Sequence, residues 1–191
     1  MLKSDYRLIL PMLALIVLVS LACNLPTMLK PAATEPVPVS SEAVQNLEDN
    51  VDQALQDLQT GGSVSLVINE SQLTSLVTFE LQSVEEPKIS DIQIRLQNGQ
   101  MKMNFSIQQG GIKAPGEVII TVTTDGQGRI TSKVDSAKIG PLPLPEEVKS
   151  MISDQINTAL QDQIHTQYEM LYIDSIVIAN RQMTIQGHVT T

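Results

Sequence analysis

The sequence predicts an α+β domain, in which two long and one short amphipathic helices pack on one face of a curved, mostly antiparallel sheet of six or seven strands. Two observations lead to this fold class. Apolar and polar residues alternate through several runs between positions 63 and 189, and short turn sequences join most of these runs. Three other segments carry apolar residues at helical spacing. Because each pattern is one-sided, the helices are expected to cover the apolar face of the sheet.

The first predicted helix begins near Glu42. Ser40 or Ser41 can cap its start, and Gly61-Gly62 ends it. Its apolar stripe consists of Val44, Leu47, Val51, Ala54, Leu55 and Leu58.

A short strand follows this helix, with Val64, Leu66 and Ile68 on one face. The stretch from Asn69 to Gln72 has the spacing of a capping box, which predicts a second and shorter helix. The apolar side of that helix consists of Leu73, Leu76, Val77 and Leu81.

The middle of the chain predicts four consecutive strands. Ile92–Leu96 and Met101–Ile107 flank Asn98-Gly99, a strong signal for a two-residue hairpin. Gly110-Gly111 leads to the alternating run Val118–Thr123, and a further turn at residues 125–128 leads to the run from residue 130 to 134. Strands joined by such short turns are antiparallel neighbours, and one face of such a sheet can remain in contact with water.

Pro141-Leu142-Pro143-Leu144-Pro145 is expected to end this run of strands, with Pro145 as the first residue of a long helix that extends to about His165. A final hairpin is predicted to join Leu171–Ile178 to Met183–Val189. The apolar residues on the two sides of Asp174-Ser175 are out of phase, which predicts a β-bulge there.

The N-terminus has the features of a secretory signal. Lys3 and Arg7 precede the apolar run Leu8–Ala22, whose fifteen residues would span roughly 22 Å as a helix, less than the ~30 Å hydrocarbon core of a bilayer. We therefore expect residues 1–22 to be a signal peptide. Four prolines between positions 24 and 40 predict an extended spacer, so residues 23–40 form a lipidated Cys and a tether, and residues 41–191 form one domain.

Cys23 follows Ser20-Leu21-Ala22, which resembles a bacterial lipobox. The resemblance implies that Cys23 becomes the lipid-modified first residue of the mature protein. A lipobox usually has Leu where this chain has Ser20. Two alternatives remain open: the apolar run stays as an uncleaved anchor, or ordinary signal peptidase cleaves before an unmodified Cys23.

Composition excludes several classes of function. The chain has a formal charge of −9 and lacks the clustered Lys and Arg residues that bind nucleic acid. No nucleic-acid partner is therefore expected. A single Cys excludes an internal disulfide and a Cys-rich zinc site. His165 and His188 are far apart, and adjacent acidic pairs such as Glu85-Glu86 read as solvated surface. We therefore predict no enzyme, no metal and no cofactor.

Aliphatic residues and methionine dominate the apolar positions of the predicted sheet and of the long helix beside it. Such flexible surfaces suit acyl chains better than flat aromatic ligands. Ordinary core packing is the competing interpretation of the same residues. The candidates for a ligand groove are Ile94, Leu96, Met101, Met103, Phe105, Val118, Ile120, Ile152 and Ile156.

Three stretches support a family resemblance: Val64–Leu73, Ile92–Phe105 around Asn98-Gly99, and the lead-in Ile139–Pro145. Their order, together with the closing hairpin, resembles the LmeA-like and YpmS-like envelope proteins over roughly residues 63–190. The resemblance implies a signal or anchor followed by a curved sheet and helices, with phospholipid binding in some members. It supplies no functional residues for individual positions.

The sequence thus predicts an extracytoplasmic lipoprotein, anchored to the cell membrane through Cys23, that binds or transfers a lipid or another apolar ligand. The alternative is a non-catalytic envelope scaffold with a fully packed core, which binds another envelope protein through its polar sheet face or an edge strand.

Overall fold

The computed structural model describes residues 35–82, 87–167 and 171–190, and within the last helix it describes side chains only up to residue 158. The predicted signal peptide, Cys23 and most of the predicted tether therefore lie outside the described residues. Pro36–Thr191 forms one compact unit. Its elements are α2 (Ser41–Gly61), β1 (Ser63–Asn69), α3 (Glu70–Leu81), β2 (Lys88–Gln97), β3 (Gln100–Gln109), β4 (Ile112–Thr124), β5 (Ile130–Ile139), β6 (Leu142–Pro143), α4 (Glu146–Gln167), β7 (Leu171–Ala179) and β8 (Gln182–Val189).

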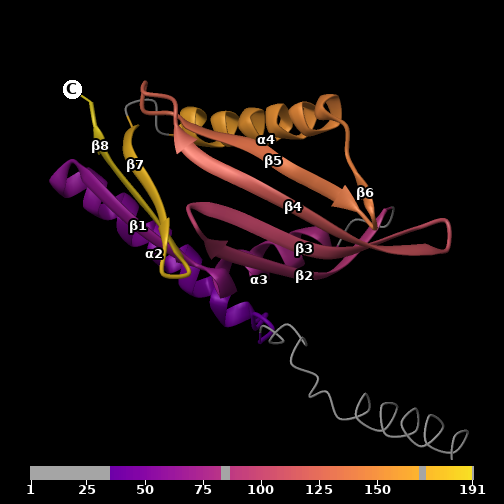
Figure 1. Cartoon of the computed structure of the whole chain (residues 1–191). Helices are drawn as coiled ribbons and strands as arrows, with labels where there is room; N and C mark the ends of the chain where they lie inside the picture. Colours follow the sequence, from indigo (N-terminus) through magenta and orange to yellow (C-terminus); the bar gives the residue numbers. More distant parts are fainter. Residues whose placement is uncertain (1–34, 83–86, 168–170, 191) are drawn as a thin grey trace, which may run out of the picture. The chain divides into compact units, whose positions relative to one another are not determined.

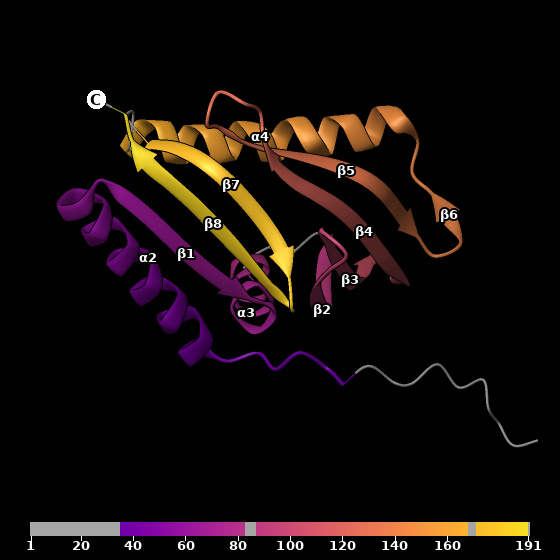
Figure 2. The same ribbon diagram turned by 60° about the vertical axis from the view of Figure 1, so that its left-hand side comes forward.

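The domain is α+β, but its described strands form two antiparallel sheets rather than the single sheet of six or seven strands that was expected (Figure 1). One sheet has the order β1-β8-β7 and the other β2-β3-β4-β5-β6. The separation arises because β1 pairs with the distant strand β8, from Ser63 opposite His188 to Asn69 opposite Gln182. The helices also differ from the expectation of a common face, since α2 packs on β1, α3 on β2 and α4 on β5 (Figure 2).

The local signals in the sequence specify most element boundaries correctly. Ser40 caps α2 by accepting a hydrogen bond from the N–H of Ala43, and Gly62 ends the helix in the left-handed conformation. The capping box of α3 is present, with reciprocal hydrogen bonds between Asn69 and Gln72. Both Asn98 and Gly99 have positive φ, as a tight hairpin turn requires. These predictions are confirmed.

Two details of the strands were tested by the structure with different results. The predicted bulge is confirmed, because the register of β7 against β8 shifts between Ile173 and Ser175. The expected end of the sheet at Pro141 is wrong, since Leu142 and Pro143 form β6 opposite Ile139 and Lys138. An edge strand tolerates Pro there because its missing N–H would point away from the sheet.

Side chains of α3 cover the free edge of β2. Thr74 Oγ1 accepts a hydrogen bond from the backbone N–H of Ile94 (3.1 Å). One helical turn earlier, Glu70 Oε1 accepts one from the N–H of Leu96 (2.9 Å). The side chains of Glu70 and Thr74 are buried, although the predicted stripe of this helix was apolar. The helix thus replaces the missing strand partner of β2.

Side chains of α4 cover β5, on the opposite side of the sheet, in the same way. Ser153 Oγ accepts a hydrogen bond from the N–H of Val134 (2.9 Å). Asn157 accepts one from the N–H of Ser132 (2.6 Å) and donates one to its carbonyl (3.0 Å). Both flanking helices therefore use residues four apart to pair with strand residues two apart.

The chain before α2 is also part of the domain, which differs from the tether expected to extend to residue 40. Val37 is buried, and its N–H donates to Oε1 of Gln93 in β2 (2.6 Å). The hydroxyl of Ser71 donates to the carbonyl of Pro38 (2.8 Å). Residues 36–40 are thus fixed against β2 and α3.

Two apolar clusters form the described core. The first joins the sheets through Leu96, Ile178 and Met183, and the second joins β4, β5 and α4 through Ile120, Val134 and Ala137. Within the described ranges, no helix combines the length and apolar character needed to cross a membrane.

The covering of the β2 edge predicts a stability cost when its acceptor is removed. Thr74→Val preserves the shape of a fully buried side chain but leaves the N–H of Ile94 without a partner, so the free energy of unfolding should fall by about 1–3 kcal/mol. Chemical denaturation followed by circular dichroism measures this change.

Thr78→Val is the matched control, because Thr78 lies one turn later and donates only to the helix carbonyl of Thr74. Its cost should stay within about 0.5 kcal/mol. Equal stability of the two variants would contradict the role assigned to Thr74.

Candidate functional site

One side of the five-stranded sheet carries almost only apolar side chains, and we call it the apolar face. Residues directly opposite each other across antiparallel strands lie on the same face, so the register defines its rows. The rows across β2, β3, β4 and β5 are Leu96, Met101, Ile120 and Val134; then Ile94, Met103, Val118 and Ala137; then Phe105, Gly116 and Ile139; and finally Ile89, Ile107 and Ala114.

The first part of the apolar face is packed against other elements. Met101 and Val122 contact both clusters, between the hairpin of β7 and β8 on one side and α4 on the other. Ile152 and Ile156 of α4 pack over Ile120 and its neighbours. This part of the sheet is an ordinary core.

The far part of the apolar face lies outside both clusters. We call it the distal end and define it as Met103, Phe105, Ile107, Ala114 and Ile139. All five residues are half-buried. The ring of Phe105 lies against Gly116, where a Cβ atom would overlap the ring, so the glycine lets the aromatic ring lie flat on the strand. The distal end is therefore an apolar surface that the two described clusters do not cover.

The nine groove candidates thus occupy three different environments. Ile94, Leu96 and Ile120 are buried, with at most 6% of their surface exposed. Met101, Val118, Ile152 and Ile156 are half-buried and packed against one or both clusters. Met103 and Phe105 are half-buried at the distal end. The structure therefore brings the candidates onto one face and beside it but exposes them unequally.

Residues that were not predicted extend the site beyond Phe105. Ile107 and Ala114 continue the same face, and Ile112 follows it to the hairpin that joins β3 to β4. Their signal was in the sequence, since the alternation of β4 continues backward from Val118 through Gly116. The glycine and Pro115 interrupted the apolar pattern there.

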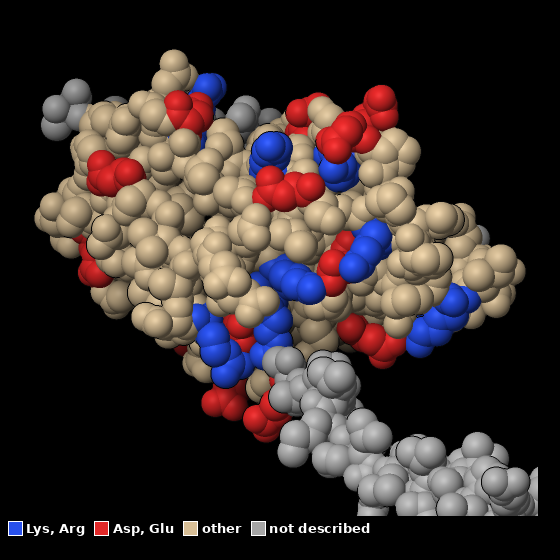
Figure 3. All heavy atoms as spheres, viewed as in Figure 1, with Lys and Arg blue, Asp and Glu red and all other residues tan. Residues whose placement is uncertain are grey.

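The opposite face of the sheet is polar and held by ion pairs. Glu117 of β4 pairs with Lys102 of β3 and with Lys138 of β5. Hydrogen bonds from these two lysines hold the pKa of Glu117 below its ordinary value despite partial burial. Figure 3 shows Lys and Arg interleaved with Asp and Glu on the face in view. The two faces of the sheet therefore have different chemistry.

A buried carboxylate connects the sheets at the start of α3. The side chain of Glu70 is 5% exposed, and its Oε2 accepts from Arg95 of β2 (3.0 Å) and Arg181 of the last hairpin (2.8 Å). Burial alone would raise the pKa of Glu70. The hydrogen bonds from the N–H of Leu96 and from both guanidinium groups outweigh it and lower the pKa.

Two surface cavities have other linings. The larger cavity has a volume of about 590 Å³ and lies between the end of α2 and the strands β1, β7 and β8. Its lining includes the polar residues Asp57, Thr60 and Asp174. The smaller, about 340 Å³, lies beside Glu70 and Arg181. In the part of the chain that the structure describes, no three His, Cys, Asp or Glu residues come together as metal ligands.

No protein-family model matches this chain, and no curated protein and no solved structure matches it. The resemblance to the LmeA-like and YpmS-like envelope proteins therefore stays a prediction.

The Glu70 network predicts how stability depends on pH. A carboxyl whose pKa is lower in the folded state stabilises it above the unfolded pKa, and this contribution disappears as the pH falls through the folded pKa. Glu70→Gln should lower the free energy of unfolding by about 2–3 kcal/mol near neutral pH, because the largely buried Arg95 and the more exposed Arg181 both lose their charged partner. Denaturation at several pH values should show the gap to the unmodified chain narrowing as the pH falls below 4.5, the ordinary pKa of a glutamate.

Glu48→Gln, at an exposed position of α2, controls for loss of a carboxylate as such. A gap for Glu70→Gln that stays constant from neutral to acid pH would contradict the assigned ionisation.

Proposed function

We propose that this protein is an extracytoplasmic lipoprotein, held at the cell membrane through Cys23, whose domain binds an aliphatic lipid chain at the distal end of the apolar face. The observation that carries the proposal is the half-buried state of Met103, Phe105 and Ile107 outside both described clusters. A fully packed core would bury the same rows.

The side chains at the distal end favour an acyl chain over other apolar ligands. Met103 is flexible, and Ile107 and Ile139 are aliphatic. An acyl chain can follow such an irregular surface, since it adapts through its own rotamers, whereas flat aromatic ligands prefer aromatic walls. Phe105 is the one aromatic residue at the distal end.

The membrane location supports a lipid as the ligand. The basic start, the apolar run Leu8–Ala22 and Cys23 together predict acylation of the cysteine and retention at a membrane surface. A domain held there has lipids as its most abundant apolar neighbours. The apolar face and the predicted anchor are independent features of the chain, and both favour the same class of ligand.

Filling the distal end with a larger side chain tests the proposal. Ala114 is half-buried and faces Ile107, so Ala114→Trp should occupy the space of the ligand. Titration with a fluorescent palmitic acid analogue should show affinity for the unmodified full-length chain and a loss of roughly tenfold or more in the variant. Organic extraction and mass spectrometry of the purified chain should also recover bound lipid from the unmodified protein.

Ala179→Trp provides the matched control, because it introduces the same side chain at an exposed position at the end of β7. It should bind the fatty acid as the unmodified chain does. If the unmodified chain takes up no fatty acid and yields no lipid, the proposal is wrong, and a scaffold role is then favoured.

A further inference from the structure

Two exposed apolar side chains lie at the same end of the five-stranded sheet. Ile112 and Leu142 are the most exposed of the large hydrophobic residues described, at 75% and 69%. Ile112 begins β4 after the turn from β3, and Leu142 follows the turn from β5 to β6. β5 ends where β4 begins, since Ile139 lies opposite Gly116, so both turns project from one end of the sheet, at the right of Figure 1. We call Ile112 and Leu142 the apolar tip.

The apolar tip is fixed in place and continuous with the distal end. The N–H of Gly140 donates to the carbonyl of Pro115 (2.7 Å), which holds the turn after β5 against β4. Ile112 has the same strand parity as Ala114, and Leu142 pairs with Ile139. The side chains of Ile112 and Leu142 therefore extend the apolar face beyond the half-buried residues of the distal end.

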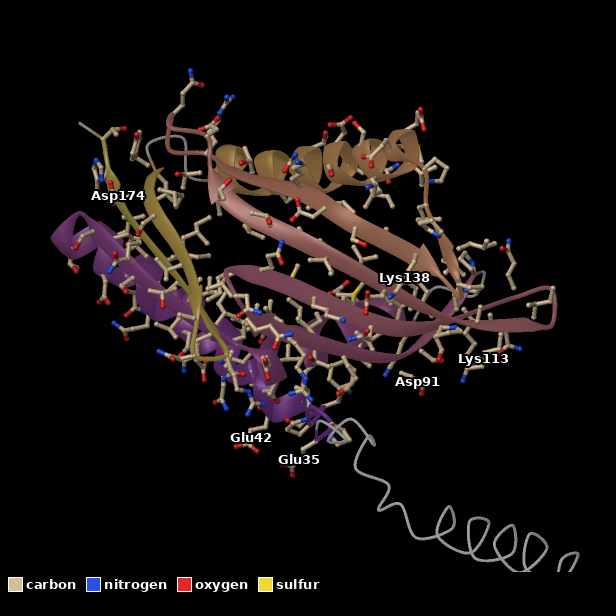
Figure 4. All side chains as sticks on the ribbon, in the orientation of Figure 1. Glu35, Glu42, Asp91, Lys113, Lys138 and Asp174 are labelled. Carbon is tan, nitrogen blue, oxygen red and sulfur yellow. The ribbon has the colours of Figure 1, made fainter. Side chains whose placement is uncertain are left out.

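The lysine beside Ile112 is paired with a carboxylate. Lys113 follows Ile112 directly and pairs with Asp91 of β2 (3.0 Å), with both side chains more than half exposed. Figure 4 shows this pair at the same end of the sheet. A lysine beside an inserted apolar residue can keep its ammonium at the headgroup level while its stem stays apolar. Because Asp91 neutralises Lys113, binding of the apolar tip to a lipid surface would depend on the apolar area buried more than on the charge of anionic lipids.

The start of the domain is attached to the middle of β2. Val37 is hydrogen-bonded to Gln93 in β2, two residues beyond Asp91. Twelve residues, with Pro26 and Pro31 among them, separate Cys23 from Pro36, and they predict an extended spacer of roughly 40 Å. If Cys23 carries the anchor, the apolar tip lies within reach of the bilayer that holds the chain.

We propose that the apolar tip docks on the surface of the lipid bilayer, with the side chains of Ile112 and Leu142 inserted among the acyl chains. We choose a bilayer as the occupant because three features suit a lipid surface. These are the two exposed aliphatic side chains of the apolar tip, the neutralised lysine beside Ile112 and the short spacer. This inference rests on the membrane location in the proposed function and adds where the domain meets the membrane, at the end where the apolar face is least covered.

The absence of tryptophan from the sequence makes a direct test possible. Ile112→Trp and Leu142→Trp each give the full-length chain a single indole at the apolar tip. Val177→Trp is the matched control, because Val177 is exposed (54%) on β7 of the other sheet. Each variant is reconstituted through its own N-terminus into phosphatidylcholine vesicles, with or without bromine on the acyl chains. All three variants replace exposed residues, and circular dichroism checks that each is folded.

Bromine should reduce the fluorescence of both tip variants by about twofold or more and leave the Val177→Trp variant nearly unchanged. If either tip variant is quenched no more than the control, the proposed docking is wrong. The result is independent of the fatty acid titration. Quenching without bound lipid would support docking and contradict the proposed ligand, and bound lipid without quenching would do the reverse.

Discussion

Backbone N–H groups of β2, and of the part of β5 that β6 leaves unpaired, donate to side chains of the flanking helices, and the rest of the domain is arranged around this pairing. Glu70 and Thr74 each accept a hydrogen bond from one backbone N–H of β2. Ser153 and Asn157 each accept one from a backbone N–H of β5. The match is geometric, because four residues of helix rise about 6 Å and two residues of strand about 6.6 Å. Exposed edges promote pairing between chains, so covering them also protects the domain from aggregation.

The position of the helices explains why the apolar face is covered unequally. A helix that reaches an edge N–H with one side can cover the face only with its adjacent side, as Ile152 and Ile156 of α4 do. The hairpin of β7 and β8 covers the part near Leu96, and Glu70 fixes that hairpin through Arg181. Arg181 has positive φ, an uncommon conformation for a residue other than glycine, and its side chain makes two contacts with Glu70. The distal end is the part of the apolar face that neither α4 nor the hairpin of β7 and β8 covers.

Sequence patterns predicted the elements well and their assembly poorly. The caps of α2, the box at Asn69 and the Asn98-Gly99 turn are local signals, and each acts within a few residues. The pairing of β1 with β8 joins Ser63 to His188, and an alternating strand carries no mark of which distant strand it will join. The covering residues were missed because Thr74 and Ser153 look like solvated helix positions in one dimension. For the candidate site, alternation identified the face correctly, but the exposure of Met103 compared with Met101 depends on tertiary packing.

Met101 and Met103 allow acyl-chain binding at the distal end to be measured within one strand. They are two residues apart on the same face of β3, and Met101 packs in both clusters while Met103 lies at the distal end. The chain with isotope-labelled methionine methyl groups can be titrated with palmitic acid and followed by NMR. If the distal end binds the acyl chain, the Met103 methyl signal should show a large, saturable shift and the Met101 signal a much smaller one. An unchanged Met103 signal at saturating fatty acid would show that the distal end does not bind it.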